Sequence, residues 1–152
     1  MDGAAMRAIP TAPNFSTPLA AKLTGVSQGT LENWARRGFL KPSGGGGKRR
    51  DPRLYAFRDL IAIRVADGLR QRGVDVRHLR RVVHYLRSRH GLELSATDVL
   101  AGSVLVTDGH DVYEVDGERG ILTSTLRDPD QSVLLVPLGH IVRRLRAEAL
   151  AA

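Results

Sequence analysis

Residues 27–37 contain a run of polar side chains that can form hydrogen bonds with an ordered set of donors and acceptors on a partner molecule. It holds hydroxyl and amide groups and ends in two cations: Ser27, Gln28, Thr30, Asn33, Arg36 and Arg37. Amide and hydroxyl groups pair with the edges of nucleic-acid bases, whereas arginine binds phosphate. We therefore expect this segment to contact a nucleic acid, with Gln28, Thr30 and Asn33 nearest the bases.

A second candidate site is a cluster of cations that follows four consecutive glycines. Its members are Lys48, Arg49, Arg50 and Arg53, with Tyr55 close behind. Cations this close repel one another unless an anionic partner is present. A plain surface loop does not account for the crowding, so we interpret the cluster as a phosphate-binding arm whose affinity falls as salt rises.

Charge is unevenly divided along the chain. Residues 1–90 carry 18 Lys/Arg and 6 Asp/Glu, whereas residues 91–152 carry 5 and 10, within an overall charge of +7. A basic half is the electrostatic footprint of nucleic-acid binding, although a solvated arginine-rich face would give the same count. The hydrophobic fraction of 42% is that of a globular protein, and no apolar run reaches the length of a membrane span.

Two short helices joined by a tight turn are expected to position the first group of side chains. Thr17 can cap a helix that has Pro18 at its first position and ends near Leu23. Thr24, Gly25 and Val26 then form a turn in which the glycine adopts a positive φ. This arrangement predicts a helix-turn-helix.

The second helix of the pair, which we call the reading helix, is expected over residues 27–37. Ser27 caps it and Gly38 ends it. Leu31, Trp34 and Ala35 have the spacing of one buried face, so Trp34 is interpreted as a core residue. The polar side chains listed first then lie on the opposite, exposed face.

The cationic cluster belongs to a segment over residues 39–55, which we call the wing. Its glycines and prolines predict a two-stranded loop with a mobile tip and a basic returning arm. Two more helices are expected beyond it. One covers 57–72, with Arg58, Arg64 and Arg70 largely outward; the other covers 76–89, capped by Asp75, with an apolar stripe that begins at Val76.

From Gly91 the pattern changes to short β-rich runs. Strands are predicted over 104–107, 111–115 and 132–136, followed by a helix over 138–150 after Pro137. The expected fold class is α+β: an N-terminal winged helix-turn-helix of four helices plus a β-wing, then a small antiparallel β-meander with a C-terminal helix. We divide the chain into a disordered leader (1–14), a DNA-binding domain (15–90) and an acidic β-rich domain (91–152) that serves dimerisation, an effector or a protein partner.

The segment over 15–89 resembles the MerR-type winged helix-turn-helix. The resemblance rests on residues 23–27 (LTGVS), Thr30 and Leu31, residues 38–42 (GFLKP), residues 53–55 (RLY) and the break between two helices at 69–76. It implies that the reading helix enters the major groove of double-stranded DNA and that the wing, through Arg49, Arg50 or Arg53, contacts the flanking backbone or minor groove. Glu32 departs from the family pattern, where a basic residue is common; it could accept from a cytosine amino group.

The same family commonly dimerises through a long coiled coil, but here the helical stripe after Asp75 lasts only about four turns. A homodimer would therefore have to assemble through residues 91–152. Burial of residues 133–136 inside a monomer explains their apolar character equally well. The expected function is a transcriptional regulator in the cytoplasm, associated with the nucleoid; the absence of cysteine suits a reducing compartment.

Two other classes of function remain open. An antitoxin, or an excisionase-like accessory protein, would use the same small winged module and bind a protein partner through residues 91–152. A metal-dependent nuclease would use the carboxylates at 108, 111, 114, 116 and 118, but acids on turns are ordinary. His78 and His84 are six residues apart, which is the wrong spacing for a metal pair. We therefore expect no catalytic residue, no metal and no cofactor.

Overall fold

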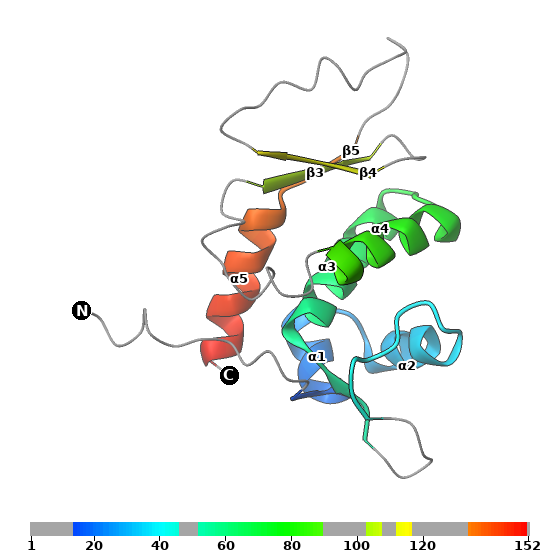
Figure 1. Cartoon of the computed structure of the whole chain (residues 1–152). Helices are drawn as coiled ribbons and strands as arrows, with labels where there is room; N and C mark the ends of the chain where they lie inside the picture. Colours follow the sequence, from blue (N-terminus) through cyan, green and yellow to red (C-terminus); the bar gives the residue numbers. More distant parts are fainter. Residues whose placement is uncertain (1–13, 46–51, 90–102, 108–111, 117–133, 152) are drawn as a thin grey trace, which may run out of the picture.

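The computed structural model describes residues 14–45, 52–89, 103–107, 112–116 and 134–151. The expected leader and the tip of the wing lie outside these ranges. The described part contains five helices and two small antiparallel sheets, which agrees with an α+β fold (Figure 1). Helix α3 is central and packs against α1, α4 and α5.

The first two helices form the expected pair with a short turn. Helix α1 covers Thr17–Thr24 and α2 covers Gln28–Arg36. The cap of α1 is Ser16 rather than Thr17, because the Ser16 hydroxyl accepts from the backbone N–H of Leu19 at 3.4 Å. The proline therefore occupies the second helical position, where its missing N–H still costs nothing. The cap at Ser27 is confirmed.

The two arms of the wing that the structure describes, residues 39–45 and 52–55, form less of a two-stranded ladder than we expected. A single bridge joins Gly44 to Leu54, through backbone hydrogen bonds of 2.9 and 2.8 Å. The returning arm, strand β2 (Leu54–Tyr55), pairs instead with β1 (Phe15–Ser16), a strand that the sequence pattern did not suggest. Glycine weakens a strand and proline lacks a donor, so the arms of the wing cannot sustain a longer ladder.

Helices α3 (Phe57–Gln71) and α4 (Val76–Arg89) follow the predicted boundaries within a residue. The apolar periodicity predicts buried positions in both helices, and all but one of them lie in the core: Leu60, Ile61, Ala62, Val65, Ala66 and Leu69 in α3, and Leu79, Val82, Val83 and Leu86 in α4. Val76 is 58% exposed, because it lies in the first turn of α4, beyond the contact with α3. Asp75 caps α4, since its carboxylate accepts from the backbone N–H of His78 at 3.0 Å.

The second sheet contains β3 (Ser103–Thr107), β4 (Val112–Asp116) and β5 (Leu134–Val136) in the order β4-β3-β5. The prediction of a meander was therefore wrong. Both outer strands are antiparallel to β3, so β4 and β5 run in the same direction and the chain must cross over between them. A meander would place the third strand beside the second.

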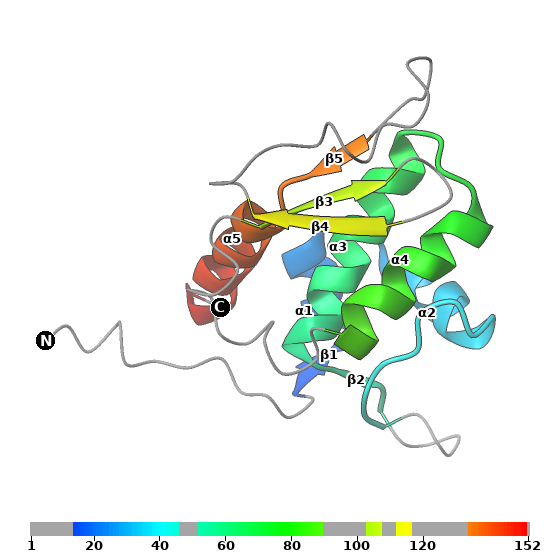
Figure 2. The same cartoon turned by 45° about the horizontal axis from the view of Figure 1, so that its top comes forward.

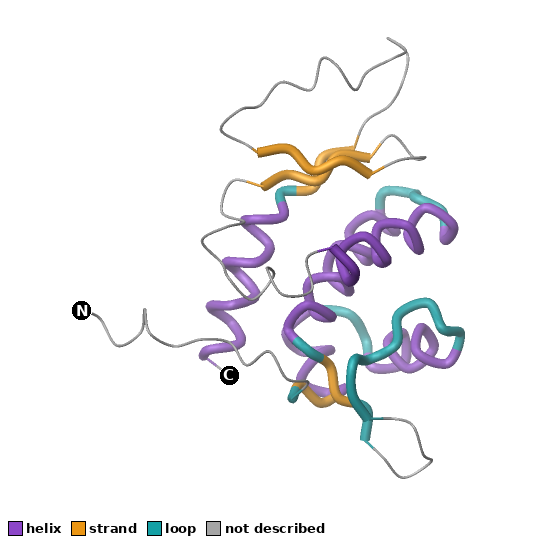
Figure 3. Tube along the Cα trace, in the orientation of Figure 1, coloured by secondary structure: helices purple, strands orange, loops and turns teal. Residues whose placement is uncertain are grey.

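Helix α5 (Leu138–Ala151) closes the molecule on the side opposite α2 (Figures 1 and 2). Its buried side chains join the same hydrophobic core as those of α1 to α4: Leu138, Val142 and Leu145, preceded by Val136 of β5. The sheet lies next to these helices, with β3 against α5 and β4 against α4 (Figure 3). None of the described helices is both long and apolar enough to span a membrane.

Candidate nucleic-acid interface

The polar face of α2 is open to solvent. Ser27, Gln28, Arg36 and Arg37 are exposed, and Thr30 and Asn33 are half-buried. The opposite face is buried and contains Leu31, Trp34 and Ala35, so the predicted division of this helix into two faces is confirmed. Within the described part of the chain, neither Arg36 nor Arg37 has an ion-pair partner. The helix thus presents hydrogen-bonding groups and two cations together.

Two of the candidate side chains on α2 are also part of its N-terminal cap. The Ser27 hydroxyl accepts from the Thr30 backbone N–H at 3.2 Å and donates to the Thr30 hydroxyl at 2.8 Å. Both oxygens keep an acceptor lone pair for an external donor. Any contact that they make with a ligand is therefore held in a fixed geometry by the helix terminus itself.

The turn between α1 and α2 is tied to α3. Gly25 has a φ of 76°, a conformation that side-chain-bearing residues rarely adopt. The neighbouring Thr24 makes two hydrogen bonds. Its backbone carbonyl accepts from Arg64 Nη1 at 2.7 Å, and its side-chain hydroxyl donates to the Ala20 carbonyl at 2.7 Å. Arg64, expected outside, therefore fixes the angle at which the helix pair stands on α3.

The end of α2 is anchored by an aromatic contact. Trp34 is 8% exposed and meets Phe39 edge to face, with ring centroids 5.0 Å apart. The Arg70 guanidinium lies over the indole at 5.4 Å from its centroid. The prediction that Trp34 is a core residue is confirmed, and its contact with Phe39 links α2 to the start of the wing.

The base of the wing is organised by Asp59, a fully buried carboxylate in the first turn of α3. Its Oδ2 accepts from the backbone N–H groups of Ser43 and Ala56, each at 2.9 Å, and its Oδ1 accepts from the Ser43 hydroxyl at 2.8 Å. Arg87 of α4 approaches Oδ1 with Nε at 3.4 Å. One side chain therefore joins both arms of the wing to α3 and α4.

The cationic wing residues are only partly described. Arg53 is half-buried on the returning arm, whereas Lys48, Arg49 and Arg50 lie outside the described residues. Gly45 has a φ of 69°, and a Cβ there would overlap the Pro52 carbonyl, so the two arms pass too close for any larger residue. The two arms therefore form a narrow stem where Gly45 passes Pro52.

Tyr55 is placed differently from the other candidate residues. Its side chain is fully buried in the core, where burial raises the pKa of the phenol. It pairs with Phe15 across β1 and β2. In this conformation Tyr55 supports the wing from inside and offers no side-chain surface to a ligand.

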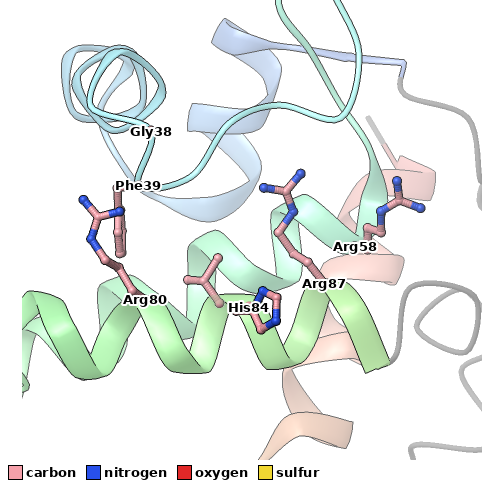
Figure 4. A pocket seen from close by; sticks show the side chains of 7 residues that line it. Gly38, Phe39, Arg58, Arg80, His84 and Arg87 are labelled. Carbon is pink, nitrogen blue, oxygen red and sulfur yellow. The ribbon is translucent and has the colours of Figure 1, made fainter.

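A cleft beside α2 gathers cations that the sequence analysis did not select. It has a volume of about 450 Å³ and lies between the segment after α2 and the face of α4 (Figure 4). The residues that line it are Gly38, Phe39, Arg58, Arg80, Val83, His84 and Arg87. The spacing of residues 80, 84 and 87 puts these side chains on one face of a helix, and that signal could have identified them. The element on the far side of the cleft could not be inferred from spacing.

Most residues of the proposed acid cluster lie outside the described ranges. In the described part of the chain, no three His, Asp or Glu side chains gather as metal ligands do. His78 contacts Asp75, with Nδ1 2.9 Å from Oδ1, and the backbone N–H of His78 holds the pKa of Asp75 below its usual range. This histidine belongs to the cap of α4.

The fold and this surface define an α+β helix-turn-helix protein. Comparison with known families agrees: the family described as "MerR HTH family regulatory protein" matches residues 15–94, more than half of the chain. The chain belongs to the MerR family of helix-turn-helix regulatory proteins. The match covers α1 to α4, which includes every residue that we assigned to the interface.

Similar proteins occur in mycobacteria. A protein of Mycobacterium bovis and one of Mycobacterium tuberculosis, each named as an uncharacterized HTH-type transcriptional regulator, are 28% identical to this chain over 135 residues. The alignment covers 86% of this chain and 55% of each relative. The chain thus spans about half the length of the curated relatives it matches.

Proposed function

We propose that this chain is a sequence-specific, DNA-binding transcriptional regulator that reads the major groove with α2. The observation that carries the proposal is the exposed polar face of α2, set at a fixed angle on α3 by Gly25 and by the contact of Arg64 with Thr24. Membership of the MerR family and the names of the mycobacterial relatives support it.

Base recognition and phosphate binding are assigned to two different sets of side chains. Gln28, Thr30 and Asn33, with Glu32 beside them, discriminate between base sequences. The wing cations Lys48, Arg49, Arg50 and Arg53, together with Arg36 and Arg37 at the end of α2, supply the attraction to phosphate. Phosphate contacts position a protein on DNA without carrying sequence information, so the two sets of substitutions should have different effects.

The first experiment is selection from a pool of genomic oligonucleotides with the purified chain at moderate salt. An enriched motif supports the proposal, and the absence of any motif contradicts it. Asn33→Ala should then change the preferred base at one or two positions of that motif. The double change Arg49→Glu, Arg50→Glu should instead weaken binding to all duplexes and lower the slope of log affinity against log salt by about 2.

A charge-matched control is available on the opposite side of the molecule. Arg143 is exposed on α5, away from α2 (Figure 2). The double change Arg143→Glu, Arg144→Glu alters the net charge as much as the wing change does. When the solution mass of this variant equals that of the unchanged protein, both the affinity and the salt slope should be nearly unchanged. Equal loss with both variants would mean that only net charge matters.

We further propose that the chain acts as a homodimer assembled through residues 91–152. Within the described residues α4 covers 14 residues, Val76–Arg89, which is shorter than the long coiled coil on which many regulators rely. The solution mass of the full chain, with and without a duplex carrying the selected motif, tests this. A monomer in both states contradicts the dimer, and co-purification of a neighbouring gene product would favour the antitoxin alternative.

A further inference from the structure

The cleft beside α4 is lined by side chains that take no part in the proposed contacts of α2 and the wing with DNA. Three arginines, Arg58, Arg80 and Arg87, line a space of about 450 Å³ together with Phe39 and Val83 (Figure 4). None of the lining residues that the structure describes is acidic. Arg87 is paired with the buried Asp59, so the excess positive charge of the cleft comes from Arg58 and Arg80, and an anion bound there would offset it.

The guanidinium groups are held in place by neighbouring contacts. Arg80 lies over the Phe39 ring, with Cζ 5.8 Å from the centroid. Arg58 Nη2 donates to the Ser43 hydroxyl at 3.3 Å. Arg87 contacts Asp59 through Nε, and among the described residues no hydrogen bond or ion pair of its two terminal nitrogens is found, so these can bind a ligand. Such a set loses little side-chain entropy when it binds, and guanidinium groups match the geometry of phosphate.

The shape of the cleft favours a small molecule as the ligand. Its volume falls within the range of about 300–1,000 Å³ that is typical of small-molecule sites, and it exceeds what a single phosphate group fills. Phe39 and Val83 provide an apolar wall beside the cations. An organic phosphate has both properties that this arrangement matches, a polyanionic group and an apolar or planar part.

We propose that this cleft is a binding site for a small organic phosphate of about the size of a nucleotide, separate from the surface that contacts DNA. The site lies between Gly38 and Phe39, which directly follow the reading helix, and the face of α4, so an occupant would touch α4 and the segment that joins the reading helix to the wing. The proposal does not depend on the proposed function, because the ligand is bound by the free protein.

The test is calorimetric titration of the full chain with pyrophosphate and with ADP at constant ionic strength, with adenosine as the ligand that lacks phosphate. The sole tryptophan, Trp34, contacts Phe39 at the cleft wall and supplies a second readout by fluorescence. We expect saturable binding of pyrophosphate and ADP with one site per chain, and none of adenosine. Failure of both anions to bind saturably at millimolar concentration overturns the proposal.

Two variants locate the site. Arg80→Gln removes one exposed guanidinium from the cleft and should weaken binding about tenfold, the usual size of one charge-assisted hydrogen bond. Arg81→Gln makes the same charge change at the next position of α4, outside the cleft lining, and should bind like the unchanged protein. Equal weakening by both variants would assign the binding to diffuse charge and overturn the site.

A third measurement separates a soluble ligand from the DNA backbone as the source of the phosphate. Arg80→Gln should leave the salt dependence of binding to a random-sequence duplex unchanged. A fall in that slope by about 1 would place a DNA phosphate in the cleft and overturn the proposal. If the chain bound no DNA at all, the titrations with pyrophosphate and ADP would still decide the matter.

Discussion

Asp59 is the residue on which the position of the wing depends most directly. It is fully buried, and its two oxygens receive donors from Ser43, Ala56 and Arg87. A buried carboxylate is tolerated only when such donors surround it, and those donors in turn lose their partner when it is removed. The sequence pattern pointed to the cations of this region and overlooked the acid that joins the described arms of the wing to α3 and α4.

Replacement of this carboxylate should therefore destabilise the protein in a graded way. Asp59→Ala leaves Ser43, Ala56 and Arg87 without their acceptor and should lower the free energy of unfolding by about 3–5 kcal/mol. Asp59→Asn keeps one oxygen for the two backbone N–H groups and should cost about 1–3 kcal/mol. Urea denaturation followed by Trp34 fluorescence measures both. Equal losses for the two variants would show that the backbone donors find other partners.

Tyr55 provides a test at alkaline pH. Burial raises the pKa of its phenol, so the folded protein retains this proton where the unfolded chain, with an ordinary pKa near 10, has released it. Its contribution to stability is therefore complete below about pH 10 and is lost as the pH rises beyond that value. Above pH 10 the unchanged protein should lose stability relative to Tyr55→Phe.

The measurement is the difference in unfolding free energy between the two proteins at several pH values between 7 and 11. The comparison cancels the titration of every group that both chains share. A constant difference across this range would contradict the raised pKa of Tyr55.

At the scale of elements, prediction from sequence succeeded where the signal is local. Ser27, Gly25 and Gly38 mark the ends of α1 and α2, and the apolar periodicity located α3, α4 and α5 within a residue or two. It failed for strand pairing. The partner of β2 is β1, which lies almost forty residues earlier, and β5 passes β4 to join β3. Such pairings depend on long-range packing, which no short pattern of residues encodes.

The α1–α2 turn and the last turn of α3 allow a matched comparison of two glycines. At Gly25 the φ of 76° disfavours any side chain, and a Cβ would lie 3.4 Å from Arg64 Nη1. At Gly68, inside α3 and exposed, a Cβ meets nothing within 4 Å. Gly25→Ala should lower stability by about 1 kcal/mol or more, whereas Gly68→Ala should raise it by about 0.5–1 kcal/mol.

Thermal and urea denaturation of the two variants measure these changes. The sign is the informative result, because the same methyl group is added in both cases. If Gly25→Ala were neutral, the turn would not require a positive φ, and the fixed angle between α1 and α2 would need another explanation.

At the scale of the whole molecule, the domain boundary that we expected near residue 90 does not divide the described hydrophobic core. Leu138, Val142 and Leu145 of α5 belong to the same cluster of buried residues as Leu31 of α2 and Leu60 of α3. Composition and charge do change near residue 90, and this change suggested two domains. Charge describes the surface, however, and it carries no information on whether two segments share an interior.

Because α5 and α2 share this core, a destabilising substitution in α5 should also destabilise α2. Leu138 is fully buried at the start of α5, so Leu138→Ala should lower the free energy of unfolding by about 2–5 kcal/mol. Arg143→Ala, an exposed change on the same helix, should stay within about 0.5 kcal/mol of the unchanged protein. Because Trp34 lies in α2, its fluorescence reports whether the helix-turn-helix unfolds together with α5. If Leu138→Ala shifts the unfolding transition seen by far-ultraviolet circular dichroism but not the one seen by Trp34 fluorescence, the two halves unfold separately. If the two transitions coincide, α5 and the reading helix unfold as one cooperative unit.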